Sequence, residues 1–244
     1  MCGVTIFAMV SAFLTVPTMN KLLLTTCCLL LATFGTSCQR HYAISGSADA
    51  ANIEGRLITL GYLDADHWVH LDSCAVTHGF FHMCGSADSV FMATLFVDEI
   101  PLMPLVLEPG TIRVSIRNLR LAATGTRLNN RLYDFLSRKN GLDAMADEID
   151  HQESQMIMNG YRSERVEAYR DSAYDALSND MEALVLGFMS DNYDNVLSLC
   201  GFSMMTNGLA RPVVTPLIRK VLDDCPAEFC EQPAVRAFLS AAGN

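Results

Sequence analysis

The sequence is poor in charge and in tryptophan, and it lacks the common catalytic motifs. Only 18% of its 244 residues are charged and one is tryptophan, whereas soluble proteins average about 25% charged residues. It contains no G-x-S-x-G, H-E-x-x-H, G-x-x-x-x-G-K or Cys-x-x-Cys, so the common hydrolase, zinc, phosphate-loop and thioredoxin motifs are all missing. The net charge of −10 argues against nucleic acid as a partner, because phosphate backbones bind cationic surfaces. We therefore expect no catalytic residue, metal or cofactor.

Residues 1–37 have no acidic side chain and a single base, Lys21. The 13-residue apolar run that follows, residues 22–34, has the build of a secretory signal and is too short to span a bilayer as a helix. Small residues at 35–37 then precede Cys38. This pattern resembles a bacterial lipobox, although Phe34-Gly35 stands where leucine is more usual. The sequence thus predicts a signal peptide over residues 1–37 and a lipid on Cys38.

Other interpretations of this segment remain open. Cys38 could be incidental beside an ordinary signal cleavage, or residues 1–34 could be an uncleaved anchor. We expect Met19 to be the true start, with residues 1–18 a mis-assigned extension. A triacylated Cys38 would hold the chain stably on a membrane. The expected location is the outer membrane, with the protein facing the periplasm.

From His41 to Thr124 the apolar residues recur with a period of two, and turn residues come every 8–12 positions. This pattern predicts antiparallel strands. Ile112, Val114 and Ile116 point one way and Arg113, Ser115 and Arg117 the other, as in a strand buried on one face. Turns are expected at His78-Gly79, as a two-residue hairpin, and at Pro109-Gly110. The prediction is a β-sandwich-like domain over residues 38–124.

At Gly125 the period changes to 3.6, which predicts a helical region over residues 125–244. Thr126 is expected to cap a first helix that stops at Asn140-Gly141, before a second that ends at Asn159-Gly160. The strongest apolar stripe lies in 163–190, and shorter helices follow. The fold class is therefore α+β, with the antiparallel sandwich first and the helices after it.

Charge is divided unevenly along the chain. Residues 113–139 contain seven bases and one acid, whereas residues 143–194 contain thirteen acids and three bases. We expect these neighbouring elements to neutralise each other within the molecule. The uneven charge could instead mark a partner site. The candidate partner surface is the strand face that carries Arg113 and Arg117, with Arg120 after it, and the alternative is that this face is simply solvated.

Five cysteines follow Cys38, so at least one has no partner within the chain. Cys74 and Cys84 flank the predicted hairpin on opposite faces and should not be bonded. Cys225 and Cys230 lie close enough in sequence for a possible disulfide, with two unpaired thiols or a redox-active pair as the alternatives. Four histidines within sixteen residues have no fixed ligand spacing and are expected on strand surfaces and turns: His67, His70, His78 and His82.

Short motifs in the chain resemble those of one protein family. They occur in order along the sequence: Tyr42–Gly46, Asp72-Ser73, His78–Phe81, Leu107–Gly110 and Gly125–Asn129. They are similar to the N-terminal domain of unknown function of envelope lipoproteins that usually carry a C-terminal thioredoxin-like (ResA-type) thiol–disulfide oxidoreductase module. Residues 190–196 and 226–235 resemble that family's helical connector, so the resemblance covers roughly residues 40–240.

This resemblance implies a sandwich with a helical connector, but the family's redox activity does not transfer because Cys-x-x-Cys is missing. The leading hypothesis is a lipid-anchored, non-enzymatic binding module of the envelope with an unidentified protein or small-molecule partner. The alternative is an accessory to a thiol–disulfide oxidoreductase, with a thioredoxin-like protein as partner, or a stand-alone remnant of such an enzyme.

Overall fold

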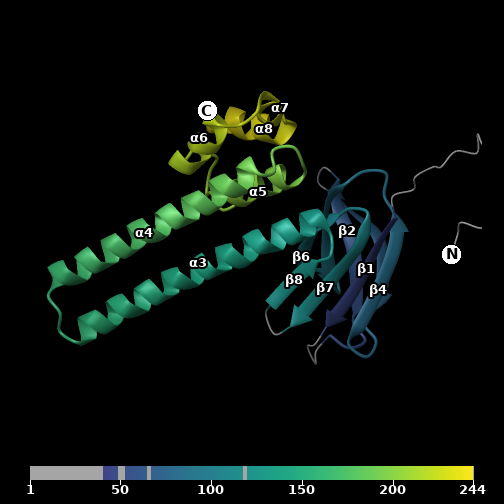
Figure 1. Cartoon of the computed structure of the whole chain (residues 1–244), viewed down its shortest axis with the longest axis horizontal. Coiled ribbons are helices and arrows are strands. Elements are labelled where there is room, and N and C mark those ends of the chain that lie inside the picture. Colours follow the sequence, from purple (N-terminus) through teal and green to yellow (C-terminus); the bar gives the residue numbers. More distant parts are fainter. Residues whose placement is uncertain (1–40, 49–52, 65–66, 118–119, 244) are drawn as a thin grey trace, which may run out of the picture. The chain divides into compact units, whose positions relative to one another are not determined.

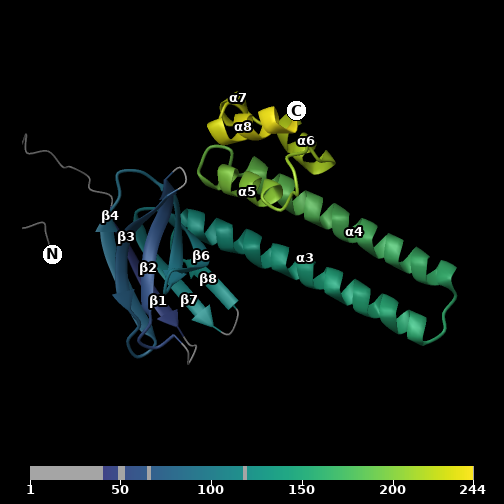
Figure 2. The same cartoon turned by 180° about the vertical axis from the view of Figure 1, so that it is seen from behind.

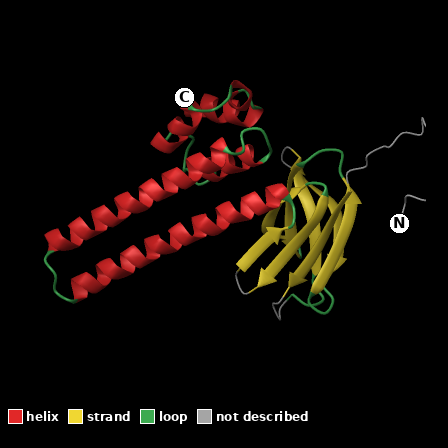
Figure 3. Cartoon of the chain, in the orientation of Figure 1, coloured by secondary structure: helices red, strands yellow, loops and turns green. Residues whose placement is uncertain are grey.

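The computed structural model describes residues 41–48, 53–64, 67–117 and 120–243. The predicted signal peptide and Cys38 lie outside these residues. Two sheets are followed by helices (Figures 1 and 3), so the predicted α+β order, sandwich first and helices after it, is confirmed. None of the helices within the described ranges has a stretch long and apolar enough to cross a membrane.

The eight strands form two four-stranded sheets (Figure 2). The first sheet contains, in spatial order, β4 (Phe80–Ser86), β1 (His41–Ala48), β7 (Gly110–Arg117) and β8 (Arg120–Thr124). The second contains β3 (His67–Ala75), β2 (Leu57–Asp64), β5 (Phe91–Val97) and β6 (Ile100–Leu107). All pairings are antiparallel except that of β1 with β7, which is parallel. The sequence pattern did not anticipate this parallel pair.

The core lies between the inner faces of the two sheets. Ile112, Val114 and Ile116 are buried there, as their alternation along β7 predicted. They meet fully buried aliphatic side chains from both sheets, namely Ile44, Ile58, Leu60, Leu95 and Leu105. Burial of this apolar surface is the main force that holds the sheets together.

The two predicted turns connect the sheets instead of closing hairpins. Thr77 and Phe80 form one isolated bridge around His78-Gly79. The strand before this turn, β3, belongs to the second sheet, and the strand after it, β4, belongs to the first. Pro109-Gly110 likewise links β6 of the second sheet to β7 of the first. The two-residue turn predicted at His78-Gly79 is confirmed, since Thr77 and Phe80 exchange both backbone hydrogen bonds. The pairing does not continue into a hairpin, because a turn motif specifies a reversal but not the sheet that the next strand joins.

A carboxylate stabilises the turn at His78-Gly79. Both residues have positive φ angles, 53° and 76°, which costs the non-glycine His78 free energy. Glu54 compensates, because its two carboxylate oxygens accept the backbone N–H groups of His78 at 2.7 Å and of Gly79 at 2.9 Å. These bonds lower the pKa of Glu54 below its ordinary value of 4.5.

This shift predicts an acid-sensitive turn. A carboxylate whose pKa is lower in the folded state stabilises the fold above its unfolded pKa, and the benefit disappears as the pH falls through the folded pKa. We expect Glu54→Gln to be less stable than wild type at pH 7 and to approach it below about pH 4. Urea denaturation of both proteins between pH 3 and 7, roughly the range over which carboxylates titrate, measures this difference. A constant difference across that range would contradict the assignment.

Two long helices follow the sandwich, α3 (Arg127–Met158) and α4 (Ser163–Ser190). The predicted stop at Asn140-Gly141 is wrong, since α3 continues through both residues. A Cβ atom added at Gly141 would meet nothing within 4 Å, and Lys139 pairs with Asp143 across this turn at 2.6 Å. Packing of α3 along α4 outweighs the low helix propensity of the two residues.

Four shorter helices complete the chain: α5 (Leu197–Thr206), α6 (Pro216–Asp223), α7 (Ala227–Cys230) and α8 (Pro233–Ala242). Thr215 caps α6 by accepting the N–H of Ile218 at 3.2 Å, and Pro216 occupies the first turn. Phe202 makes edge-to-face contacts with Phe229 and Phe238. These rings join α5, α7 and α8 into one packed cluster.

Buried polar side chains attach the start of α3 to the edge strand β6. The amide of Asn129 is fully buried; its oxygen accepts the N–H of Val106 at 3.0 Å and its nitrogen donates to the Val106 carbonyl at 2.7 Å. Glu108 accepts the N–H groups of Leu128 and Asn129 at 2.7 and 3.1 Å. Thr126 occupies the N-cap position of α3, as predicted, but its side chain makes no capping bond to the backbone. Glu108 accepts the free N–H groups instead, and the Thr126 hydroxyl accepts a bond from the Asn129 amide at 2.9 Å.

Candidate interaction surface

The three arginines of the predicted partner surface lie on strands β7 and β8. Arg113 and Arg117 are exposed on β7, on the face opposite the buried Ile112, Val114 and Ile116. Arg117 is paired directly with Arg120 of β8. All three thus project from the outer face of the first sheet, which we call the arginine face.

The register identifies every neighbour on the arginine face. Arg113 lies beside Ser45 of β1 and Thr124 of β8, and Ser45 lies beside His82 of β4, with 3.3 Å between the serine Oγ and the His82 Nδ1. The other outward positions are small, apolar or neutral, apart from one histidine: His41, Ala43, Ser47, Phe80, Cys84, Ser86, Thr111, Ser115 and Ala122. Over these four described strands, no carboxylate occupies the face.

The arginines consequently lack internal counter-ions. No ion pair between described residues involves Arg113, Arg117 or Arg120. Like charges directly opposite on neighbouring strands repel, so Arg117 and Arg120 raise the energy of this face unless an anion approaches. The guanidinium groups of this face are therefore free to pair with an anionic group.

The predicted neutralisation between the basic and acidic segments does not take the form of direct ion pairs among the described residues. Within the described part of the chain, the one ion pair that joins residues 113–139 to residues 143–194 is Lys139–Asp143, which spans a single helical turn. The carboxylates of the long helices and the arginine face remain separate charged surfaces. Sequence proximity did not bring them together, because α3 meets the sandwich through the buried Asn129 and not through its charges.

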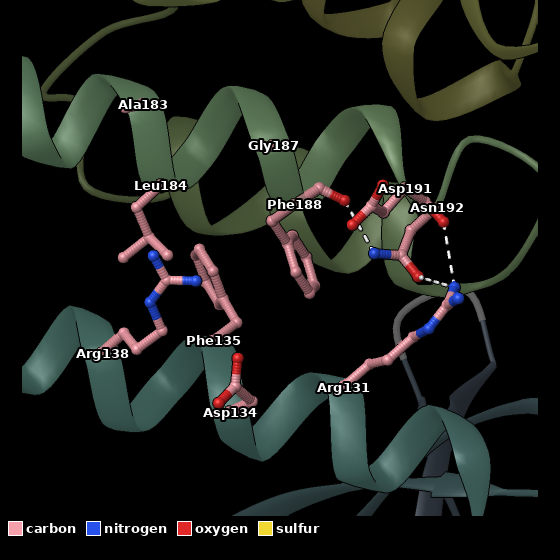
Figure 4. Close-up of a pocket in the computed structure, with 10 residues that line it drawn as sticks. All are labelled: Arg131, Asp134, Phe135, Arg138, Ala183, Leu184, Gly187, Phe188, Asp191 and Asn192. Atoms are coloured by element: carbon pink, nitrogen blue, oxygen red, sulfur yellow. Dashed lines mark hydrogen bonds between the residues drawn. The ribbon is translucent and has the colours of Figure 1, made fainter.

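A cavity of about 280 Å³ lies between α3 and α4 (Figure 4). Arg131 donates to the Asp191 carbonyl at 3.0 Å and to the Asn192 side chain at 3.3 Å. Beside this contact, Phe135 stacks on Phe188 with 4.1 Å between ring centroids. These contacts connect the start of α3 to the end of α4, so the cavity belongs to a structural joint between the helices.

The cysteines of the described region fall into two groups. Cys225 and Cys230 are joined sulfur to sulfur in the structure with their Cα atoms 6.6 Å apart, within the usual range for a disulfide; pairing in the cell stays a prediction. Cys74 and Cys84 are unbonded, as predicted, but because they lie in different sheets. Burial raises the pKa of Cys200 to about 11, which keeps its thiol protonated at neutral pH.

The four clustered histidines do not converge. His67 and His70 lie on β3 of the second sheet, His78 lies in the turn, and His82 lies on β4 of the first sheet. Among the residues that the structure describes, no group of three or more histidine, cysteine, aspartate or glutamate side chains is placed to hold a metal.

Comparison with known families gives one match. No curated protein sequence matches the chain. Residues 42–132 match a family model described as "Domain of unknown function (DUF4369)". The matched segment covers the sandwich and the first turns of α3, including Glu108 and Asn129. It does not include residues 190–196 and 226–235, which resemble a helical connector. Residues 42–132 are therefore similar to this family of unknown function.

Proposed function

We propose that the chain is a lipid-anchored, non-enzymatic binding module of the cell envelope, located on the outer membrane and facing the periplasm, whose arginine face holds a partner. The single observation that carries the proposal is the arginine face itself, which has three exposed cations and no carboxylate on its described strands. Cationic faces steer acidic partners and fix their orientation.

A lipid on Cys38 would tether the chain close to the start of β1 in the sequence. Cys38 precedes β1 by three residues in the sequence, so a lipid there would hold the start of β1 within about 11 Å of the bilayer. Strand β7 runs parallel to β1, beginning beside Tyr42 and ending at Arg117. Seven residues of extended strand place Arg117 about 23 Å further along.

A second candidate is an accessory to a thiol–disulfide oxidoreductase, or a stand-alone remnant of such an enzyme. The contact between Cys225 and Cys230 favours it, because it gives the chain one dithiol that could exchange with a partner. The resemblance of the short motifs points in the same direction. In this version a thioredoxin-like protein occupies the arginine face.

The experiment is site-specific crosslinking in cells. We expect a photo-reactive residue at position 117 of the full chain to capture an envelope protein, and Arg113→Glu with Arg120→Glu to reduce the yield at least roughly tenfold because the cations that hold the partner are gone. The matched control places the probe at Arg211, which is exposed on the C-terminal part. Capture of a thioredoxin-like protein favours the second candidate. No product, or equal products from both positions, contradicts the proposal.

A further inference from the structure

Helix α4 carries an acidic stripe on its exposed side. The stripe consists of Glu164, Glu167, Asp171 and Asp175, spaced three, four and four residues apart. At 3.6 residues per turn these positions stay within an arc of about 80°, and their backbone spans about 16 Å. All four side chains are exposed, which makes the stripe a narrow line of negative charge.

The stripe is almost unpaired. Of its four carboxylates, Asp171 alone has a cationic partner within the described residues, Arg170 at 3.0 Å, and the Asp171 side chain is still 67% exposed. The neighbouring Arg165 lies over the ring of Tyr161, 4.7 Å from its centroid. The stripe and the arginine face are thus two exposed surfaces of opposite charge, and the described residues supply almost no charged partners for either.

The dimensions of the two surfaces agree. Arg113 and Arg117 are four residues apart on one strand, or about 13 Å, and Arg120 lies beside Arg117 on the next strand. The residues between the arginines are small, with Ser45, Ser47 and Ala122 around Ser115. A helix can therefore approach the face closely, with its carboxylates between the guanidinium groups.

We infer that the partner of the arginine face is a second copy of this chain, docked through the acidic stripe of α4. This inference rests on the proposed function, since it names the partner of the same surface. The contact is heterologous, because each copy offers a different patch, so copies can add in a row. Salt weakens the association because it screens the attraction between the two surfaces. The net charge of −10 makes whole chains repel each other, so association is strongest where a tether concentrates the copies.

Charge reversal on each side provides the test. The two variants of the purified full chain are Arg113→Glu with Arg117→Glu, and Glu167→Lys with Asp175→Lys. Sedimentation velocity should show wild-type association at about 50 mM salt that is lost at about 500 mM. Each variant alone should associate at least about tenfold more weakly. An equal mixture should recover a dimer, because the first variant keeps its stripe and the second keeps its arginine face.

The matched control, Arg211→Glu with Arg236→Glu, makes the same charge change at exposed positions of the C-terminal part and should associate like wild type. Wild type that stays monomeric at low salt, or a mixture that does not recover the dimer, would overturn the inference. If a double variant fails to fold, Arg120→Glu replaces the first and Glu167→Lys alone the second. A different protein captured from position 117 would then leave the proposed function standing without the self-association, whereas no capture would remove both.

Discussion

Asn129→Leu is expected to lower the free energy of unfolding by about 3–5 kcal/mol, because leucine has nearly the right volume but cannot hydrogen-bond. The substitution leaves the N–H and carbonyl of Val106 and the hydroxyl of Thr126 without the partners that they have now at 3.0, 2.7 and 2.9 Å. Each buried polar group that loses its partner costs about 1–3 kcal/mol, with less than full additivity.

Urea denaturation followed by circular dichroism measures this loss. The matched control is Asn140→Leu on the same helix, where the asparagine is exposed and makes no side-chain hydrogen bond among the described residues. The control should change stability by less than about 0.5 kcal/mol. An Asn129→Leu protein within about 1 kcal/mol of wild type would mean that Asn129 does not hold α3 on β6.

Gly46→Ala is expected to destabilise the sandwich by about 2–3 kcal/mol through overpacking. Gly46 lies on β1 directly opposite Phe81 of β4. A Cβ atom at position 46 would overlap the Phe81 ring, which is itself only 5% exposed and has little room to move. The glycine is needed here for space and not for its backbone angles.

Smaller side chains at position 81 should relieve the strain. Phe81→Ala alone should lower the free energy of unfolding by about 3–5 kcal/mol. The variant with both Gly46→Ala and Phe81→Ala should lose less than the sum of the two separate losses, by a coupling energy of about 1–3 kcal/mol. The matched control is Gly141→Ala, which meets nothing within 4 Å and should stabilise α3 by up to about 1 kcal/mol. Strict additivity of the Gly46 and Phe81 substitutions would contradict the contact.

The order of strands and helices could be predicted from hydrophobic periods because each period reflects local geometry. The long helix from Ser163 to Ser190 was predicted at its observed bounds. Strand β8, by contrast, was not assigned, since Arg120–Thr124 is short and only Leu121 and Ala123 mark its inner face. Strand β6 contains Pro101 and Pro104, which argue against a strand interior, but both are tolerated because β6 lies at a sheet edge.

Pairing between distant strands could not be predicted because it depends on which faces meet. Alternation placed Arg113 and Arg117 on one face correctly, but only the register with β8 brings Arg120 to their side. The motifs that suggested a family gave no functional site. Glu108, Gly125 and Asn129 instead fix the junction of sheet and helix, where the N–H of Gly125 bonds to Asn130 at 3.0 Å and its positive φ of 101° suits glycine.

The place of β1 at the centre of the first sheet has a consequence for the order of folding. Its two neighbours, β4 and β7, begin at Phe80 and Gly110, so the earliest strand to be made must wait for chain that is synthesised much later. The second sheet has two nearby pairings, β2 with β3 and β5 with β6, and its one longer pairing, β2 with β5, still spans less chain than that of β1 with β7. Because distant contacts require long loops to close, we expect the second sheet to assemble first and to act as a template on which β1 is captured last.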